Sequence, residues 1–565
     1  MSAVVGNAAL AAFDVLVIGS GAGGAAAAHM LTKAGRNVLV LEAGPNQFAG
    51  LDDPAPGRPS PRFSNDEVKQ RKRGFLDADV LVDPRTFRRR EADGARTFVG
   101  DVNALPKTVG GGAVHADLKM PRFIPADFRL GSAMRPVHGA AFADWPVDYD
   151  ALERFYLYAE QVGGVAGVAG ASPFDPPRSG PYPMPPGVPM YVALRAAEGA
   201  AALGYHPYPY PTGVNSQPYD NRPPCVDCGF CGGYGCPINA KGSPAVTTLR
   251  KALLSGRCQL RPETRAVRLR LGPTGSEVVG VDALGPRGEP LTFTADCYVL
   301  AASPIEDARL CLLSDPGGPG VGNSSGLVGR NLMFHLQTIA IGVLEERLHG
   351  HRGRSVTHAV TDFRGVPDDP RRPLGGIVEL GAAEGPISEA LNYARDLGQH
   401  GAPLKSLIRQ SPFRDHFMVL TMQAEDAPQP SNRVDLDPEV RDLDALPVAR
   451  VTYQSHPWEL AARAFYAPKL LDVVQAAGAR WAFIAPADTV PSSRHIMGTL
   501  RFGEDPAASV CDPTGRFHDV GNLWAADGAL FPTSSGFNPT LTIVALGLRV
   551  GAGIAYPGDP DRALT

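Results

Sequence analysis

Four cysteines lie within twelve residues of the chain, in the stretch CVDCGFCGGYGC. They are Cys225, Cys228, Cys231 and Cys236, with two, two and four residues between them, and Pro237 follows. Thiolates at such a spacing could hold an iron–sulfur cluster, because a bacterial ferredoxin run has gaps of two, two and three before Cys-Pro. Zinc sites more often use two well-separated C-x-x-C pairs. The alternatives are a cluster, a zinc ion, a pair of disulfides, or a packed loop without a ligand.

A second group of polar residues near the C-terminus is suited to proton transfer. His495 precedes a Met-Gly-Thr turn, and Asn538 begins the sequence NPT before an apolar helical stretch. A histidine with an ordinary pKa of about 6.5 can accept a proton near neutral pH, and an asparagine amide can donate to a developing alkoxide. The structural alternatives are a loop histidine bonded to backbone, and Asn538 as an N-cap with Pro539 at the first helical position.

The N-terminal residues 14–44, DVLVIGSGAGGAAAAHMLTKAGRNVLVLEAG, carry the strongest local signal. An apolar strand leads into a glycine-rich turn with Gly19, Gly21 and Gly24 in the G-x-G-x-x-G positions, and a second strand ends in Glu42. The first two glycines let the backbone approach a pyrophosphate, the third lets the helix pack on the strand, and the carboxylate suits a ribose. The pattern predicts a dinucleotide-binding unit and leaves NAD and FAD open. No second copy occurs in a strand–turn–helix setting, which argues against a separate nicotinamide domain.

Further motifs follow in a fixed order along nearly the whole chain. They are VGGGAVHADLKMPRF (109–123), YVLAASPIEDARLCLLS (298–314), VGNSSGLVGRNLMFH (321–335), SNRVDLDP (431–438), SSRHIMGT (492–499) and GFNPTLTI (536–543). Together with the N-terminal unit they resemble the glucose–methanol–choline (GMC) family of FAD-dependent oxidoreductases. The last two segments are more similar to its pyranose oxidase and gluconate dehydrogenase branch than to its choline or cholesterol branches.

This resemblance implies an enzyme that oxidises the CH–OH group of a sugar, polyol or sugar-like metabolite to a carbonyl, with hydride transfer to FAD. It implies His495 as the base and Asn538 as its partner. The residues expected to contact the cofactor are Gly19, Gly21, Gly24, Glu42, Gly111, His115, Asp527, Gly528, Asn538, Pro539 and Thr540.

The resemblance also bears on how FAD is attached. Some relatives bind the flavin covalently through a histidine at the position of His115, but the neighbours in AVHAD lack the aromatic or threonine residues of that type. We therefore expect noncovalent FAD.

The cysteine stretch has a counterpart in the same family. Certain sugar dehydrogenase subunits hold a three-iron cluster, and Cys225, Cys231 and Cys236 are similar to its ligands, with a last gap one residue longer here. A cluster would make the chain a dehydrogenase that passes electrons to a carrier protein or quinone. Without a cluster the stretch is structural, and oxygen becomes an acceptor.

The middle of the chain predicts a second domain. Residues 148–163 have helical periodicity, and HFMVLTMQAE and LPVARVTYQ alternate as antiparallel strands do. Gln423 and His335 lie in segments that could line a cavity, with core or loop roles as alternatives. The expected fold is α/β and α+β: a Rossmann-like FAD-binding domain with a parallel sheet, and a discontinuous substrate domain on an antiparallel sheet. The expected ranges are 8–150, 222–312 and 490–558 for the first, and 151–221 and 313–489 for the second.

Composition restricts the remaining classes of function. The chain has 565 residues and a formal charge of −4, which gives no indication of nucleic acid or an anionic membrane as partner. Its longest apolar run is interrupted by Arg549 and too short to span a bilayer, and the N-terminus lacks a secretory signal, so we expect a cytoplasmic protein. Two other readings are a lyase with structural FAD on the same scaffold, and an electron-transfer subunit that uses the cysteines.

Overall fold

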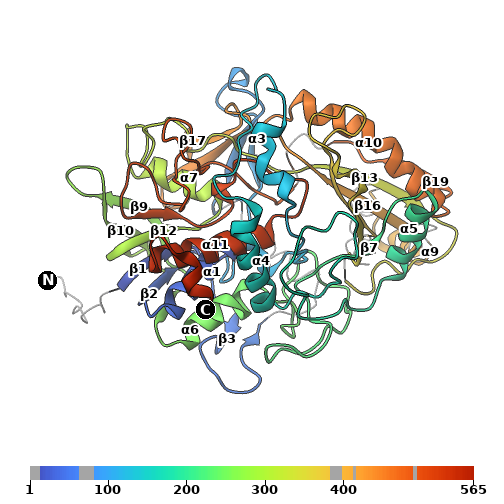
Figure 1. Ribbon diagram of the computed structural model, residues 1–565, viewed down its shortest axis with the longest axis horizontal. Coiled ribbons are helices and arrows are strands. Elements are labelled where there is room, and N and C mark those ends of the chain that lie inside the picture. The colour runs from blue at the N-terminus through green and yellow to red at the C-terminus, as the bar shows by residue number, and fades with distance from the viewer. Residues whose placement is uncertain are drawn as a thin grey trace.

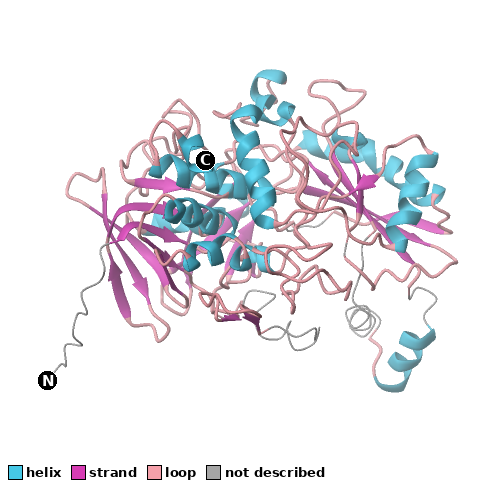
Figure 2. Ribbon diagram, turned by 60° about the horizontal axis from the view of Figure 1, so that its bottom comes forward, coloured by secondary structure: helices cyan, strands magenta, loops and turns pink. Residues whose placement is uncertain are grey.

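The chain divides into two groups of strands and helices joined by long loops (Figures 1 and 2). The computed structural model describes residues 13–62, 80, 82–354, 356–381, 398–410, 415–487, 491 and 493–565. In the part of the chain so described, no helix has both the length and the apolar character needed to cross a bilayer.

The first group is built on a five-stranded parallel sheet in the order β20-β12-β1-β2-β8. Its central strands are apolar and buried, as in parallel sheets that are covered on both faces. The strands are β1 (Phe13–Ile18), β2 (Val38–Leu41), β8 (Cys258–Arg261), β12 (Ala295–Leu300) and β20 (Leu523–Ala525), and the helices of this group are α1 (Ala22–Lys33), α6 (Thr248–Leu254), α7 (Pro304–Leu313) and α11 (Thr540–Ala555). A small antiparallel sheet adjoins it, with β9 (Arg265–Leu271), β10 (Val278–Leu284) and β11 (Pro290–Phe293).

The second group is built on a six-stranded antiparallel sheet in the order β19-β13-β16-β15-β14-β7. Helices α5 (Tyr191–Ala202) and α10 (Pro457–Ala476) pack on it and share a separate apolar core with it. The strands are β7 (Tyr208–Pro209), β13 (Leu336–Val343), β14 (His358–Val360), β15 (Gly376–Leu380), β16 (Phe417–Ala424) and β19 (Trp481–Ile484), and α9 (Gly401–Gln410) follows β15. The parallel and antiparallel sheets confirm the predicted fold class.

A four-stranded sheet connects segments that the predicted ranges assign to different domains. Strands β5 (Arg85–Arg88) and β6 (Phe98–Gly100) join β17 (Arg433–Arg441) and β18 (Pro447–Thr452). Strand β18 is antiparallel to β17, as LPVARVTYQ predicts, but parallel to β5. The predicted helix is α4 (Tyr149–Gly163), whose buried face packs on α11 of the first group. The domain ranges therefore stay a prediction.

The remaining elements are short. They are β3 (Phe48–Ala49), β4 (Ser60–Pro61), α3 (Leu130–Ala133) and 3₁₀ helices at Glu91–Asp93, Gly112–Val114, Pro125–Arg129, Pro244–Val246, Asp362–Arg364, Gly528–Leu530 and Pro560–Leu564.

Helices α1 and α11 lie close together because small residues face each other along their contact. A Cβ atom on Gly547 would lie 2.5 Å from the carbonyl oxygen of Gly23, and one on Gly551 would lie 2.6 Å from that of Ala27. Such separations are far below van der Waals contact. The glycines of α11 therefore permit a packing distance that fixes where its N-terminus lies.

Candidate active site

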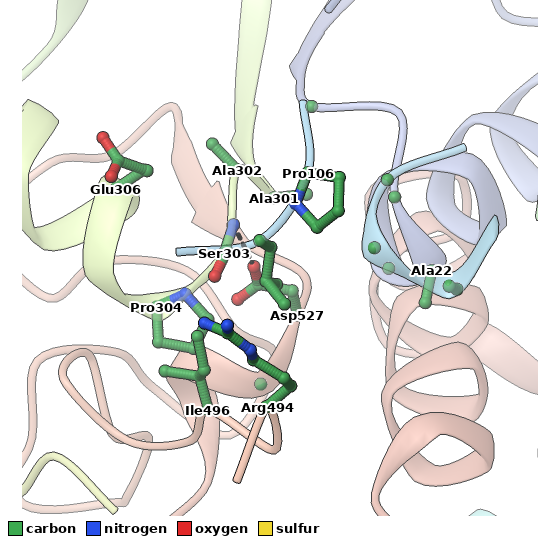
Figure 3. A pocket seen from close by; sticks show the side chains of 18 of the residues that line it. Ala22, Pro106, Ala301, Ala302, Ser303, Pro304, Glu306, Arg494, Ile496 and Asp527 are labelled. Atoms are coloured by element: carbon green, nitrogen blue, oxygen red, sulfur yellow. Dashed lines mark hydrogen bonds between the residues drawn. The ribbon is translucent and has the colours of Figure 1, made fainter. Parts of the chain in front are cut away.

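One cavity of about 590 Å³ runs between the parallel sheet and the antiparallel sheet, which is a volume typical of ligand sites. Figure 3 shows part of its wall, where Ala22, Pro106, Ser303, Arg494 and Asp527 come from segments far apart in the sequence. Of the residues predicted to act on cofactor or substrate, those that line the cavity are Gly19, Gly21, Glu42, Gly111, His115, His495, Asp527, Gly528, Asn538, Pro539 and Thr540.

Gly24 is the predicted cofactor residue that lies outside this lining. A Cβ at Gly24 would stand 2.1 Å from the carbonyl oxygen of Gly19 and 3.1 Å from Cβ of Ala301. Its position therefore serves the close packing of α1 on β1 and β12, as expected for the third glycine of the motif.

Gly21 and Gly111 border the cavity where a side chain on either residue would narrow it. A Cβ at Gly21 would have only the Cα of Gly111 within 4 Å, at 3.9 Å, and would otherwise project into the cavity. Gly111 has φ +64°, and a Cβ there would approach the Cα of Gly21 to 2.7 Å. Helix α1 begins here with its free amide groups at the cavity and no acidic residue in its first turn. This cradle fits the pyrophosphate of a dinucleotide such as FAD.

Glu42 is fixed at the end of β2. Its Oε2 accepts hydrogen bonds from the backbone N–H of Ser20 at 3.1 Å and from the Ser20 hydroxyl at 2.6 Å, and its Oε1 accepts from the Gly44 N–H at 2.8 Å. Burial raises the pKa of Glu42, and these hydrogen bonds oppose that shift. The carboxyl group is thus held at the cavity wall where the motif predicts a ribose contact.

Asp527 holds a strained turn at the cavity edge. Its Oδ2 accepts the N–H of Ser303 at 2.9 Å, drawn as a dashed line in Figure 3, and its Oδ1 accepts the N–H of Ala529 at 2.8 Å. Ser303 has φ +86°, a conformation that non-glycine residues rarely adopt. Burial raises the pKa of Asp527 and, with Asp527 beside it, that of Asp307. The buried pair therefore favours retention of a proton, which limits negative charge beside a phosphate-binding turn.

His495 also lines the cavity. Its Nδ1 is 2.8 Å from Nδ1 of His335, its Nε2 is 3.4 Å from Nδ2 of Asn538, and its backbone N–H donates to the Ser493 hydroxyl at 3.2 Å. Burial, followed by the influence of His335 and the Lys119 ammonium, lowers the pKa of His495 well below its usual value. The ring is therefore neutral at physiological pH and can accept a proton.

Asn538 is oriented by neighbours on both sides of its amide. The Tyr210 hydroxyl donates to Oδ1, and Nδ2 donates to Oε1 of Glu379 at 3.0 Å as well as facing His495. The N-cap reading is wrong, because α11 begins at Thr540 and this side chain makes its hydrogen bonds in the cavity instead of with the helix backbone. Pro539 precedes the helix instead of occupying its first position.

Glu379, which accepts a hydrogen bond from Asn538, is itself held by a charged side chain. The Lys119 ammonium contacts Oε2 of Glu379 at 2.7 Å and Asp117 at 3.1 Å, and Nε2 of Gln423 donates to Oε1 of Glu379 at 3.2 Å. Burial lowers the pKa of Lys119, but the two carboxylates outweigh it and raise the pKa overall. Gln423 lines the cavity, which was one of the two roles predicted for it; the other was a role in the core or in a loop.

Lys119, Glu379 and Tyr210 are site residues that were not predicted from the sequence. Lys119 stands in the quoted segment 109–123, so its place beside His115 was a usable signal. Glu379 and Tyr210 belong to β15 and to the loop after β7, without a local motif, and only the tertiary fold brings them to Asn538.

The cysteine stretch adjoins the cavity near His115. Gly232 and Gly233 line it, and the Gly233 N–H donates to the His115 carbonyl at 2.8 Å. The buried Lys241 ammonium donates to the carbonyls of Ala116 at 2.9 Å and Cys231 at 3.0 Å. Hydrogen bonds therefore hold the cysteine stretch against the segment that contains His115.

The cysteines themselves are not arranged as a metal site. Burial raises the pKa of Cys225 to about 11 and that of Cys231 to about 12, so both side chains are thiols in the absence of a metal. Among the residues that the structure describes, no three His, Cys, Asp or Glu side chains are placed to hold a metal ion. This arrangement does not fit a preformed iron–sulfur site.

Comparisons with known proteins agree with the interpretation of this cavity as a flavin site. Models described as GMC oxidoreductase match residues 196–337 and 428–547, and one described as FAD binding domain matches residues 14–50. The chain is 30% identical to 6'''-hydroxyparomomycin C oxidase of Streptomyces lividus over 98% of this chain and 93% of that protein. It is 28% identical to the gluconate 2-dehydrogenase flavoprotein of Pantoea cypripedii, over 94% of this chain and 92% of that protein.

The fold is also that of a solved flavoenzyme. Formate oxidase of Aspergillus oryzae superposes with a TM-score of 0.63 at 14% identity, covering 97% of this chain and 98% of that one. With a matched FAD-binding unit, two matched oxidoreductase segments and a relative similar over nearly its whole length, this chain belongs to the GMC oxidoreductase family of FAD-dependent enzymes that act on CH–OH donors.

Proposed function

We propose that this enzyme oxidises an alcohol group of a sugar, polyol or sugar-like metabolite to a carbonyl, with His495 as the base. The observation that carries the proposal is the 3.4 Å separation between Nε2 of His495 and Nδ2 of Asn538 at the cavity wall. A hydroxyl oxygen can lie about 2.8 Å from both nitrogens, which is ordinary hydrogen-bond distance. It would donate its proton to His495 and accept from Asn538.

In this mechanism, bound FAD supplies the acceptor for the hydride that leaves the carbinol carbon. His495 removes the hydroxyl proton, since the pKa shift described above leaves its ring neutral. The Asn538 N–H stabilises the negative charge that develops on the oxygen, and Tyr210 and Glu379 hold that amide in the required orientation.

The polar lining supports a substrate with several hydroxyl groups. Gln337 and Gln423 line the cavity and are joined by a hydrogen bond of 3.2 Å between their amides. Lys119 also lines it but is already paired with two carboxylates, so its charge is not open to an acidic substrate. We therefore favour neutral polyols and sugars over sugar acids as substrates.

Anaerobic flavin reduction tests the proposal. Purified holoenzyme is mixed with fructose, glucose, glycerol and gluconate in turn, and we expect at least one neutral polyol to bleach the flavin absorbance. Turnover of an alcohol without bleaching in any case would favour a lyase with structural FAD instead.

The role of His495 is tested by His495→Ala, which we expect to slow flavin reduction by roughly 10²–10⁴-fold while FAD stays bound. His206→Ala serves as control, because His206 is an exposed histidine paired with Asp362 and should leave the rate unchanged. Full turnover by His495→Ala would favour a function in electron transfer over catalysis at this site.

A further inference from the structure

We propose that His335 is a positioning residue that fixes the tautomer of His495. It accepts a hydrogen bond from Nδ1–H of His495 and thereby keeps Nε2 of His495 without a hydrogen, facing the substrate. The inference rests on the proposed function, in which His495 is the base. His335 immediately precedes β13, is 3% exposed and lies behind His495, outside the cavity lining.

Nε2 of His335 faces a backbone carbonyl group. This nitrogen lies 3.4 Å from the carbonyl oxygen of Ser534. The backbone of Ser534 and that of Ser535 both raise the pKa of His335, which is the sign expected of accepting carbonyls. A carbonyl oxygen can accept a hydrogen bond but cannot donate one. Nε2 of His335 must therefore carry a hydrogen.

His335 is held in its neutral form by its surroundings. Burial lowers its pKa to about 4, and the Arg364 guanidinium acts in the same direction. The ring is therefore neutral at physiological pH. A neutral imidazole has a single N–H, so the hydrogen on Nε2 leaves Nδ1 of His335 as an acceptor.

The acceptor Nδ1 of His335 faces His495 and determines which nitrogen of His495 carries the hydrogen. The two Nδ1 atoms are 2.8 Å apart, and the ring planes meet at 81°, an edge-on approach. A contact this short between nitrogens needs one hydrogen, which His495 must supply. Because His495 is also neutral, its Nε2 is unprotonated. That nitrogen is the one facing the Asn538 N–H, which can donate to it.

The opposite arrangement produces two mismatches. If His335 donated from Nδ1, its bare Nε2 would face the lone pairs of the Ser534 carbonyl. Nε2 of His495 would then carry a hydrogen pointing at the amide N–H donor of Asn538. Both contacts would be repulsive, and His495 would present no lone pair to a substrate hydroxyl.

A direct test measures the tautomer without any substrate. Holoenzyme labelled with ¹⁵N-histidine is studied by NMR, and His495→Gln identifies the signals of His495. We expect Nδ1 of His495 to carry the hydrogen in the native enzyme and the two nitrogens to exchange roles, at least in part, in His335→Leu. A hydrogen on Nε2 of His495 in the native enzyme, or an unchanged tautomer in His335→Leu, would overturn the proposal.

A kinetic test compares two variants of similar size. His335→Asn keeps an acceptor oxygen near the place of Nδ1, and His335→Leu has none. With the polyol that reduces native flavin fastest, we expect His335→Leu to lower the reduction rate by roughly 10²–10⁴-fold, as for a base held in the wrong tautomer. His335→Asn should stay within about tenfold of the native rate, and KM should change little in either.

The pH profile separates this role from a structural or electrostatic one. A tautomer effect lowers the rate plateau in His335→Leu at pH values above the acid limb, whereas loss of the influence of His335 on the pKa of His495 moves only the acid limb; FAD content is unchanged. Equal losses in both variants, or a profile that only shifts along the pH axis, would contradict the proposal. If no alcohol reduces the native flavin, the proposed function fails, and the NMR result still decides the tautomer.

Discussion

At the scale of single residues, the chemistry depends on an ammonium group that no motif predicted. Lys119 is one of the groups that lower the pKa of His495, and its own charge is held by Glu379 and Asp117. A cation beside an imidazole disfavours the protonated ring, so Lys119 keeps His495 in its base form at lower pH.

Lys119→Met should therefore raise the pKa of His495. Because the neutral ring is the active form, the acid limb of flavin reduction should move to higher pH, with slower reduction at pH 6 than at pH 8. Glu379 and Asp117, once unpaired, would shift it in the same direction. Single-turnover reduction across pH measures the effect.

The control for this change is Lys251→Met, since Lys251 forms a partly exposed pair with Asp220 away from the cavity. It should leave the profile in place. An acid limb that stays put or moves to lower pH in Lys119→Met would show that Lys119 does not act on His495 as inferred.

At the scale of elements, the site depends on where α11 begins. Asn538 precedes this helix, and Gly547 and Gly551 set how closely the helix approaches α1. The position of Asn538 thus follows from glycines two to three turns away. Sequence patterns foresaw the helix but not this contact, because periodicity shows which face of a helix is apolar and not which neighbour meets it.

Two substitutions in α11 separate close packing from helix propensity. Gly551→Ala places a Cβ 2.6 Å from the Ala27 carbonyl oxygen and should cost about 1–3 kcal/mol of unfolding free energy by overpacking. Gly553→Ala meets no atom within 4 Å and should be neutral or stabilising by up to about 1 kcal/mol. Thermal melts of both holoenzymes measure the difference. Equal melting temperatures would mean that α1 and α11 can separate without loss.

At the scale of the whole molecule, the sequence predicted both sheets, and the predicted cofactor and catalytic residues other than Gly24 all line the cavity. The N-terminal turn, Glu42, His495 and Asn538 could be found because each lies in a local pattern that chemistry requires. Glu379 and Tyr210 could not be found, because their role arises only when the antiparallel sheet faces the N-terminus of α11. The sheet β17-β18-β5-β6 was not predicted for the same reason: its strands β18 and β5 are more than 300 residues apart in the sequence.

Because the cavity is formed by segments far apart in the sequence, we expect a bound cofactor to stabilise the folded chain. The cavity is lined from the ends of β1 and β2, the segment 111–119, the residues that follow β12 and the region 493–543, so a ligand that fills the cavity would contact distant segments of the chain. A ligand that binds only the folded state stabilises it by RT ln(1 + [L]/Kd), about 2.7 kcal/mol at one hundred times Kd. Removal of noncovalent FAD should therefore lower the melting temperature, and added FAD should restore it.

The experiment is a melt before and after dialysis against concentrated bromide, with acid precipitation of a parallel sample. If FAD is noncovalent, acid precipitation leaves a colourless pellet, and added FAD restores the melting temperature. Yellow colour kept in the pellet would mean a covalent bond at His115. A brown shoulder beneath the flavin bands, lost in acid together with iron, would mean that the cysteines rearrange around a cluster. In that case the thiols of Cys225 and Cys231 must be deprotonated by the metal, because burial alone holds them protonated.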